Sequence, residues 1–190
     1  MKLFLVRHAM PAFGPDVPAP AWELNSEGRC KARTLAGALP AGALLIASRE
    51  PKARQTLEPA GSVQTDERFN EVTSDEPYEG DFRARRRAYV TGTDRPGWEP
   101  RDQVVTRFTD GIRFWTAQAD GRPLVIASHG MAMTLWLGAT VGLTNAGAFW
   151  ADLRLPDLLR VDVTDKQVVR LVYGDPSGTS ETPVLASETH

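Results

Sequence analysis

Residues Leu3-Phe4-Leu5-Val6, followed directly by Arg7-His8, decide how this sequence folds. Four consecutive apolar residues indicate a short strand that is buried on both faces, as in a parallel sheet covered by helices. Residues 43–47 and 124–127 have the same character, and each run is followed by a segment with helical signals. Because strands alternate with helices, the sequence predicts an α/β fold, a three-layer α/β/α sandwich with a mostly parallel central sheet.

The remaining segments fit one domain over residues 1–173. Asn25 or Ser26 is a candidate cap for a helix reaching about residue 39, and a second helix should run from Pro51 to about residue 59. Apolar residues at helical spacing predict a helix over residues 103–119, and another follows over residues 131–141. Residues 158–163 and 168–173 should form a strand pair. The segment 174–190, rich in Ser, Thr, Pro and Gly, is expected to be a flexible tail.

Composition limits the classes of function. The 190 residues include 22 basic and 24 acidic side chains, a net charge of -2, which does not indicate a nucleic-acid or membrane partner. The single cysteine, Cys30, excludes an intrachain disulfide and a four-cysteine zinc site. Met1 to Val6 is too short for a signal peptide, and no apolar run approaches the roughly 20 residues that span a bilayer. We expect a cytoplasmic protein; its oligomeric state cannot be predicted.

Two histidines share one context in this pattern. His8 follows the first predicted strand, and His129 follows the strand over residues 124–127 with one serine between them. The strand over residues 43–47 leads to Ser48 and then to the basic stretch that contains Lys52. Parallel sheets bind ligands at the carboxyl ends of their strands, so these groups should meet at one edge as a pocket for an anion such as phosphate. The alternative is that each histidine only packs in the interior with a hydrogen bond.

The stretch Phe4-Leu5-Val6-Arg7-His8-Ala9 resembles the signature of the histidine phosphatase superfamily, the family of phosphoglycerate mutases and related phosphatases. Further blocks resemble other motifs of the family, in the same order. They are Trp22-Glu23-Leu24-Asn25-Ser26-Glu27-Gly28, Ser48-Arg49-Glu50-Pro51-Lys52-Ala53-Arg54-Gln55-Thr56, Phe69-Asn70-Glu71-Val72 with Tyr78-Glu79-Gly80, and Ala127-Ser128-His129-Gly130. The resemblance spans residues 3 to about 173 and implies a phosphoglycerate mutase-like fold.

The resemblance also implies a mechanism. His8 is the expected nucleophile, which is phosphorylated and then hydrolysed, and Glu71 is the expected general acid and base. The expected phosphate ligands are Arg7, Lys52, His129 and Gly130, whose cations and donors offset charge on the phosphoryl oxygens. No metal and no cofactor are required. Among the other carboxylates, Glu99 beside Trp98 is the main alternative for the acid.

Two departures from the family pattern bear on activity. Lys52 stands where the family usually has arginine, and a lysine offers a point charge in place of a two-pronged guanidinium. Arg54, two residues later, points about 200° away on a helix and is expected at the surface. Ala9-Met10-Pro11 after His8, and the short segment between Glu71 and residue 103, favour a phosphatase over a mutase.

We therefore expect a metal-independent phosphomonoesterase that acts on a small-molecule phosphoester or a phosphoprotein. Residues 71–103 are the predicted cap that selects the substrate, which the sequence does not identify. One alternative is a phosphate-binding or regulatory module with little turnover, and another is a protein phosphohistidine phosphatase. Arg83 to Arg87 in this cap could attract a polyanion, but a solvated helix face beside acidic residues is the simpler interpretation.

Overall fold

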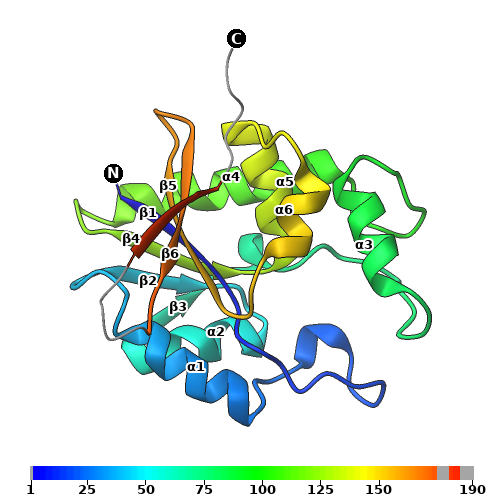
Figure 1. Ribbon diagram of the computed structural model, residues 1–190, viewed down its shortest axis with the longest axis horizontal. Helices are drawn as coiled ribbons and strands as arrows, with labels where there is room; N and C mark the ends of the chain where they lie inside the picture. Colours follow the sequence, from blue (N-terminus) through cyan, green and yellow to red (C-terminus); the bar gives the residue numbers. More distant parts are fainter. Residues whose placement is uncertain (1, 175–179, 185–190) are drawn as a thin grey trace.

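A computed structural model describes residues 2–174 and 180–184, and within them it shows one seven-stranded sheet in the order β3-β2-β4-β1-β5-β6-β7 (Figure 1). The strands are β1 Leu3–Arg7, β2 Leu44–Ala47, β3 Val63–Thr65, β4 Leu124–Ser128, β5 Asp157–Asp162, β6 Gln167–Val172 and β7 Ser180–Val184. The first four strands of that order are parallel, and the pairs β1–β5, β5–β6 and β6–β7 are antiparallel. The predicted α/β sandwich is confirmed.

Helices cover both faces of the sheet. They are α1 Ser26–Ala36, α2 Pro51–Leu57, α3 Phe82–Val90, α4 Arg101–Gln118, α5 Gly130–Val141 and α6 Ala146–Asp152, with short 3₁₀ turns at Ala19–Ala21, Glu58–Ala60 and Glu67–Phe69. Leu3 and Leu5 of β1 pack in one core with α4, α5 and α6, whereas Phe4 and Val6 pack in a second core with α1 and α2. This alternation is the period of two that a strand imposes, and it produces the three layers seen in Figure 1.

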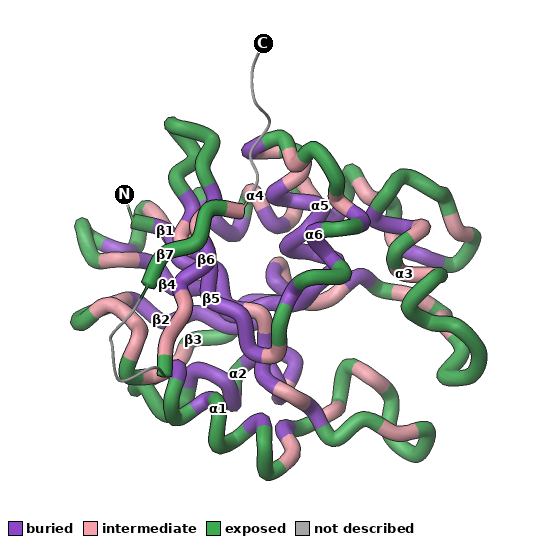
Figure 2. Tube along the Cα trace, viewed as in Figure 1, coloured by how far each residue is buried: buried purple, intermediate pink, exposed green. Residues whose placement is uncertain are grey.

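Burial separates a rigid centre from an exposed rim. Strands β1, β2 and β4 are buried along almost their whole length, and α5 is buried on nearly every face (Figure 2). The loop over residues 12–23 and most of α3 are exposed or half-buried. The buried strands and α5 therefore form a central frame, and the loop over residues 12–23 and α3 form its exposed rim.

The start of α1 shows how a loop is fixed to this frame. Asn25 caps the helix by accepting a hydrogen bond from Gly28 N at 2.7 Å, as its sequence position predicts. A Cβ atom on Gly28 would lie 2.1 Å from the carbonyl oxygen of Met10, so only glycine allows this close approach. The chain that follows β1 is thereby held against α1.

Two elements differ from the sequence-based expectation. Part of the expected flexible tail is ordered, because Ser180–Val184 forms β7 on the free edge of β6; the other residues after 174 lie outside the described residues. An edge strand tolerates Pro183, and Arg160 binds Glu181 across the sheet at 2.8 Å. Helix α6 was not expected, although Asn145 caps it from its side chain.

Candidate active site

The two histidines that the sequence places at strand ends come together. Strands β1 and β4 are parallel neighbours in which Arg7 pairs with Ser128, so the next residues leave the sheet side by side. The backbone N–H of His8 donates to Ser128 O at 3.1 Å. The ring centroids of His8 and His129 are 5.1 Å apart with an interplanar angle of 56°. Two imidazoles therefore lie side by side at the carboxyl edge of the sheet, where we place the candidate site.

A hydrogen bond to a backbone carbonyl defines which nitrogen of His8 carries the proton. Nδ1 of His8 lies 2.7 Å from Ala9 O, and because a carbonyl only accepts, Nδ1 is the donor and the lone pair lies on Nε2. Nε2 of His129 lies 2.7 Å from Oγ of Ser48, and that hydroxyl already accepts from Glu50 N at 3.2 Å. A hydroxyl can donate to Nε2 or accept from it, and Oε1 of Glu50 also lies 3.4 Å from Nε2, so these contacts are compatible with either neutral form of His129.

Both rings are neutral near pH 7. Burial lowers the pKa of His8 well below 6.5, and the nearby charges of His129, Lys52 and Arg7 lower this pKa further. Burial likewise lowers the pKa of His129 well below 6.5, with further contributions from Lys52, Arg107 and Arg7. Nδ1 of His129 is buried and has no hydrogen-bond partner among the described residues. His8 thus has the properties of a nucleophile, and His129 those of a neutral donor.

Arg7 lies beside the histidines and against Gly130. Its guanidinium donates from Nη1 to Leu153 O at 2.6 Å, while its buried Nε has no partner among the described residues. A Cβ atom at Gly130 would lie 3.1 Å from Nε1 of Trp150 and 3.4 Å from Nε and Cζ of Arg7, so a side chain there would crowd the indole and touch the guanidinium. Burial lowers the pKa of Arg7 to about 10, opposed by Glu71 and Asp157, and the side chain stays charged at neutral pH.

The second cation comes from α2. Lys52 is buried, and its Nζ donates to Ala19 O at 2.7 Å and to the carboxylate of Glu50. An ammonium group has three N–H donors, so one remains for a ligand. Arg54 lies at the surface, as the helical spacing predicts, where it pairs with Glu58 at 2.7 Å. Of the two basic residues, only Lys52 is buried, and its charge contributes to the lowered pKa of both histidines.

Of the two carboxylates considered as the acid, only Glu71 reaches this edge of the sheet. Its Oε1 accepts from Ala132 N at 3.0 Å and its Oε2 from Met131 N at 3.2 Å, at the first turn of α5. Glu99 is held elsewhere, because its Oε1 accepts from Nε of Arg107 at 2.6 Å. The carboxylate of Glu71 therefore lies against the N-terminus of α5, which His129 directly precedes.

Other polar groups hold these residues in place, and the sequence did not single out all of them. Ser128 donates to Phe69 O at 2.7 Å, which fixes the chain just before Glu71. Arg107 donates to the carbonyl oxygens of Arg68 and Asn70 at 2.7 and 2.9 Å. Arg107 was missed because its sequence position belongs to the polar face of α4. Glu50 was missed as well, although a charged residue between a buried strand and Pro51 was a usable signal.

The arginines of α3 are not simply a solvated face. Arg85 and Arg86 both bind the buried carboxylate of Glu76, at 3.1 and 2.7 Å. The charges of Arg86 and Arg83 also contribute to the lowered pKa of Arg7, so α3 adds positive potential around Arg7. This helix belongs to the segment expected to act as the cap.

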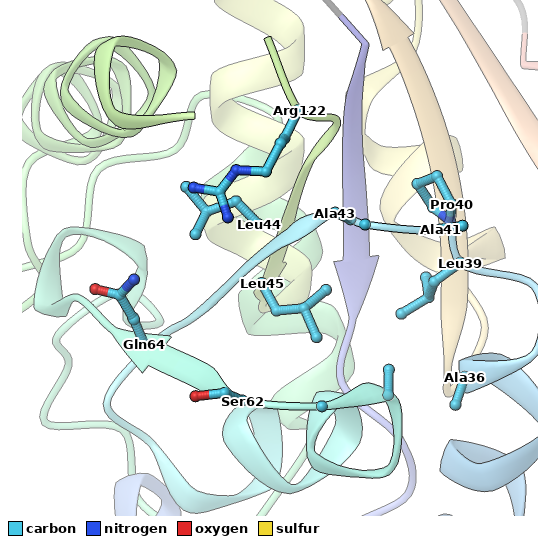
Figure 3. Close-up of a pocket in the computed structure, with 13 residues that line it drawn as sticks. Ala36, Leu39, Pro40, Ala41, Ala43, Leu44, Leu45, Ser62, Gln64 and Arg122 are labelled. Atoms are coloured by element: carbon cyan, nitrogen blue, oxygen red, sulfur yellow. The ribbon is translucent and has the colours of Figure 1, made fainter. Parts of the chain in front are cut away.

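A pocket lies at the other end of β2, away from the histidines. It is lined mostly by small and apolar residues, together with Ser62, Gln64 and Arg122, and no acid or histidine lines it (Figure 3). In residues 2–174 and 180–184, no helix combines the length and apolar character needed to cross a bilayer. In the same residues, His, Cys, Asp and Glu side chains do not gather in threes that could hold a metal ion.

Comparison with known proteins agrees with this geometry. A family model described as "Histidine phosphatase superfamily (branch 1)" matches residues 3–176. Among solved structures, the YhfR protein of Bacillus stearothermophilus has a TM-score of 0.66 at 18% identity, covering 85% of this chain and 91% of that one. The TTHB049 protein of Thermus thermophilus has a TM-score of 0.63 at 26% identity, covering 91% and 98%.

A third similar structure is a mycobacterial glucosyl-3-phosphoglycerate phosphatase, with a TM-score of 0.61 at 20% identity, covering 84% of this chain and 88% of that one. No curated protein sequence matches the chain. At these identities the structural likeness concerns the fold, and the family follows from the model that matches nearly the whole chain.

Proposed function

The chain belongs to branch 1 of the histidine phosphatase superfamily and is a phosphatase of that type, and from this premise we propose that it hydrolyses phosphomonoesters through a phosphohistidine on His8. The observation that carries the proposal is the placement of His8, with its lone pair on Nε2, beside His129 and close to the charges of Arg7 and Lys52. In the proposal Arg7, Lys52 and Nδ1 of His129 hold the phosphoryl oxygens, so no metal is needed.

The reaction has two steps. In the first, Nε2 of His8 forms a bond to phosphorus, the bond from phosphorus to the leaving oxygen breaks, and Glu71 donates a proton to that oxygen. In the second, a water attacks phosphorus while Glu71 takes a proton from it, and the bond from phosphorus to nitrogen breaks. Inorganic phosphate leaves, and His8 and Glu71 return to their starting states. The cations offset the charge spread over the phosphoryl oxygens in both steps.

The substrate of the proposal is a small phosphoester chosen by the cap over residues 71–103. Within this segment the charges of Arg83 and Arg86 act on Arg7, although Arg86 is paired with Glu76, and we propose that Arg83 favours a substrate with negative charge beyond the reacting phosphate. A panel of phosphorylated metabolites, together with a phosphohistidine-bearing protein, would rank the substrates and include the alternative of a protein phosphatase.

The test is the replacement of His8 by alanine. Wild-type protein should hydrolyse 4-nitrophenyl phosphate, and acid-labile, base-stable phosphate should appear on it after rapid quenching in base. His8→Ala should lose both signals. A Cys30→Ser variant is the matched control, because Cys30 is exposed and is not one of the residues of the candidate site. Unchanged turnover in His8→Ala would refute the proposal, and phosphate binding without turnover in the wild type would favour a regulatory module.

A further inference from the structure

One buried carboxylate, that of Glu50, contacts three parts of the candidate site. Its Oε2 accepts a hydrogen bond from Nζ of Lys52, and both side chains are almost fully buried, with 7% and 6% of their surface exposed. Its Oε1 accepts from the backbone N–H of Glu71 at 2.7 Å. The same oxygen lies 3.4 Å from Nε2 of His129. No other carboxylate of the described residues joins these three groups.

The side chain of Glu50 does not cap α2, although its position at the start of that helix would allow it. Glu50 is the N-cap residue of α2. Its backbone is extended at φ -70° and ψ 129°, as expected for a residue before proline. The carboxylate instead contacts the side chain of Lys52 in α2 and the backbone of Glu71, 21 positions further along the chain. The contacts of Glu50 therefore link α2 to the segment that carries Glu71.

The charge of Glu50 has a second consequence. The carboxylate of Glu50 is buried against the ammonium of Lys52, so a phosphate dianion enters a site in which Glu50 already neutralises Lys52. A fixed negative charge in a buried site opposes the binding of an anion. The carboxylate therefore both orients Lys52 and weakens the hold of the site on inorganic phosphate.

We propose that Glu50 is a positioning residue that holds Lys52 and the Glu71 backbone in register around the phosphate, at the cost of weaker binding of the phosphate product. This inference rests on the proposed function, since it assigns Glu50 a role in the same reaction. It predicts that loss of the charge has opposite effects on turnover and on phosphate affinity. A variant whose fold was merely loosened would show both lower turnover and weaker phosphate binding. The two measurements therefore distinguish a loosened fold from the proposed role of Glu50.

The experiment measures kcat with 4-nitrophenyl phosphate and the Kd of inorganic phosphate by calorimetry, for the wild type, Glu50→Gln, Glu50→Asp and Glu58→Gln. Glu50→Gln removes the charge and can accept from only one of its two main partners. We expect its kcat to fall about tenfold or more while the Kd of phosphate becomes about tenfold tighter. Glu50→Asp keeps the charge but is one methylene shorter, so kcat should fall while the Kd stays within about twofold of the wild type.

Glu58→Gln is the matched control, because Glu58 pairs with Arg54 at the surface just after α2. It should match the wild type in both quantities. Unchanged kcat in Glu50→Gln, or weaker phosphate binding in that variant, overturns the inference. Should Glu50→Gln fail to fold, Glu50→Asp decides: a lower kcat at constant Kd supports the inference, and an unchanged kcat overturns it. A wild type that neither hydrolyses phosphoesters nor binds phosphate refutes the proposed function instead.

Discussion

Oγ of Ser48 lies 2.7 Å from Nε2 of His129, at the point where β2 and β4 end side by side. We propose that Ser48 donates to Nε2 in the neutral form of His129 that carries its proton on Nδ1, the nitrogen without a partner among the described residues. In this arrangement the hydroxyl determines which nitrogen of His129 can donate a hydrogen bond, although it does not determine where the ring lies. The position of Ser48, directly after a buried strand, makes this relation possible.

Replacing Ser48 by alanine should therefore lower turnover without removing any group that touches the phosphate. We expect kcat to fall about tenfold to hundredfold, less than the roughly 100- to 1000-fold loss typical of removing a donor that contacts the reacting group, because Ser48 acts only through His129. Imidazole ¹⁵N NMR should show Nδ1 of His129 protonated in the wild type and a tautomer mixture in the variant. Ser62→Ala, at an exposed serine before β3, should behave like the wild type. Equal kcat values for Ser48→Ala and Ser62→Ala would contradict this role.

The choice between Glu71 and Glu99 can be tested through the leaving group. Glu71→Gln removes the proposed proton donor, so kcat on an alkyl phosphate should fall about 100-fold or more. The loss on 4-nitrophenyl phosphate should be much smaller, because that leaving group departs without a proton. Glu99→Gln loosens Arg107 and should produce similar, modest losses on both substrates. A leaving-group dependence seen in Glu99→Gln and not in Glu71→Gln would reverse the assignment.

Local signals explain why the core of the fold could be predicted from the sequence. Apolar runs such as Leu3 to Val6 mark buried strands because burial on both faces removes the need for alternation. Once these strands are parallel neighbours, the meeting of His8 and His129 follows from their positions after the strands. The cap of α1 by Asn25 could be predicted for the same reason, since its partner is only three residues away.

The features that could not be predicted depend on partners distant in the chain. Strand β7 needs the free edge of β6, which its own composition of serine, threonine and proline does not reveal. Arg107 binds carbonyl oxygens more than 35 residues earlier, and Glu50 acts on a backbone 21 residues later. In each case the residue resembles an ordinary charged residue of the protein surface until its tertiary partner is known.

Lys52 and Arg54 give a matched pair for the phosphate contact. Lys52→Met keeps the length of the side chain but removes its charge, and we expect kcat/KM to fall about 100-fold, because a buried site without this cation holds the phosphoryl oxygens less strongly. Arg54→Met should leave kcat/KM within about twofold, because Arg54 is exposed and pairs only with Glu58. Lys52→Arg restores the charge and should recover most of the activity. Equal losses in Lys52→Met and Arg54→Met would show that Lys52 is not a phosphate ligand.

The lowered pKa values of His8 and His129 predict how stability depends on pH. Both rings are neutral in the folded protein, whereas in the unfolded chain they take up protons near pH 6.5. The unfolded state therefore binds more protons below pH 6.5, so this contribution to stability is complete above that pH and is lost as the pH falls. Each ring should contribute a slope of up to about 1.4 kcal/mol per pH unit.

Urea unfolding between pH 7.5 and 5.0 measures this slope in a window above the ordinary titration of most carboxylates. The free energy of unfolding of the wild type should be constant down to about pH 7 and then decrease. His8→Asn and His129→Asn should each remove about one proton from the difference between the states, and so reduce the slope below pH 6.5. The difference in slope is the informative quantity, because a buried asparagine also changes the stability at pH 7.5. If both variants keep the wild-type slope, the rings are not held neutral, and the nucleophile proposed for His8 loses its physical basis.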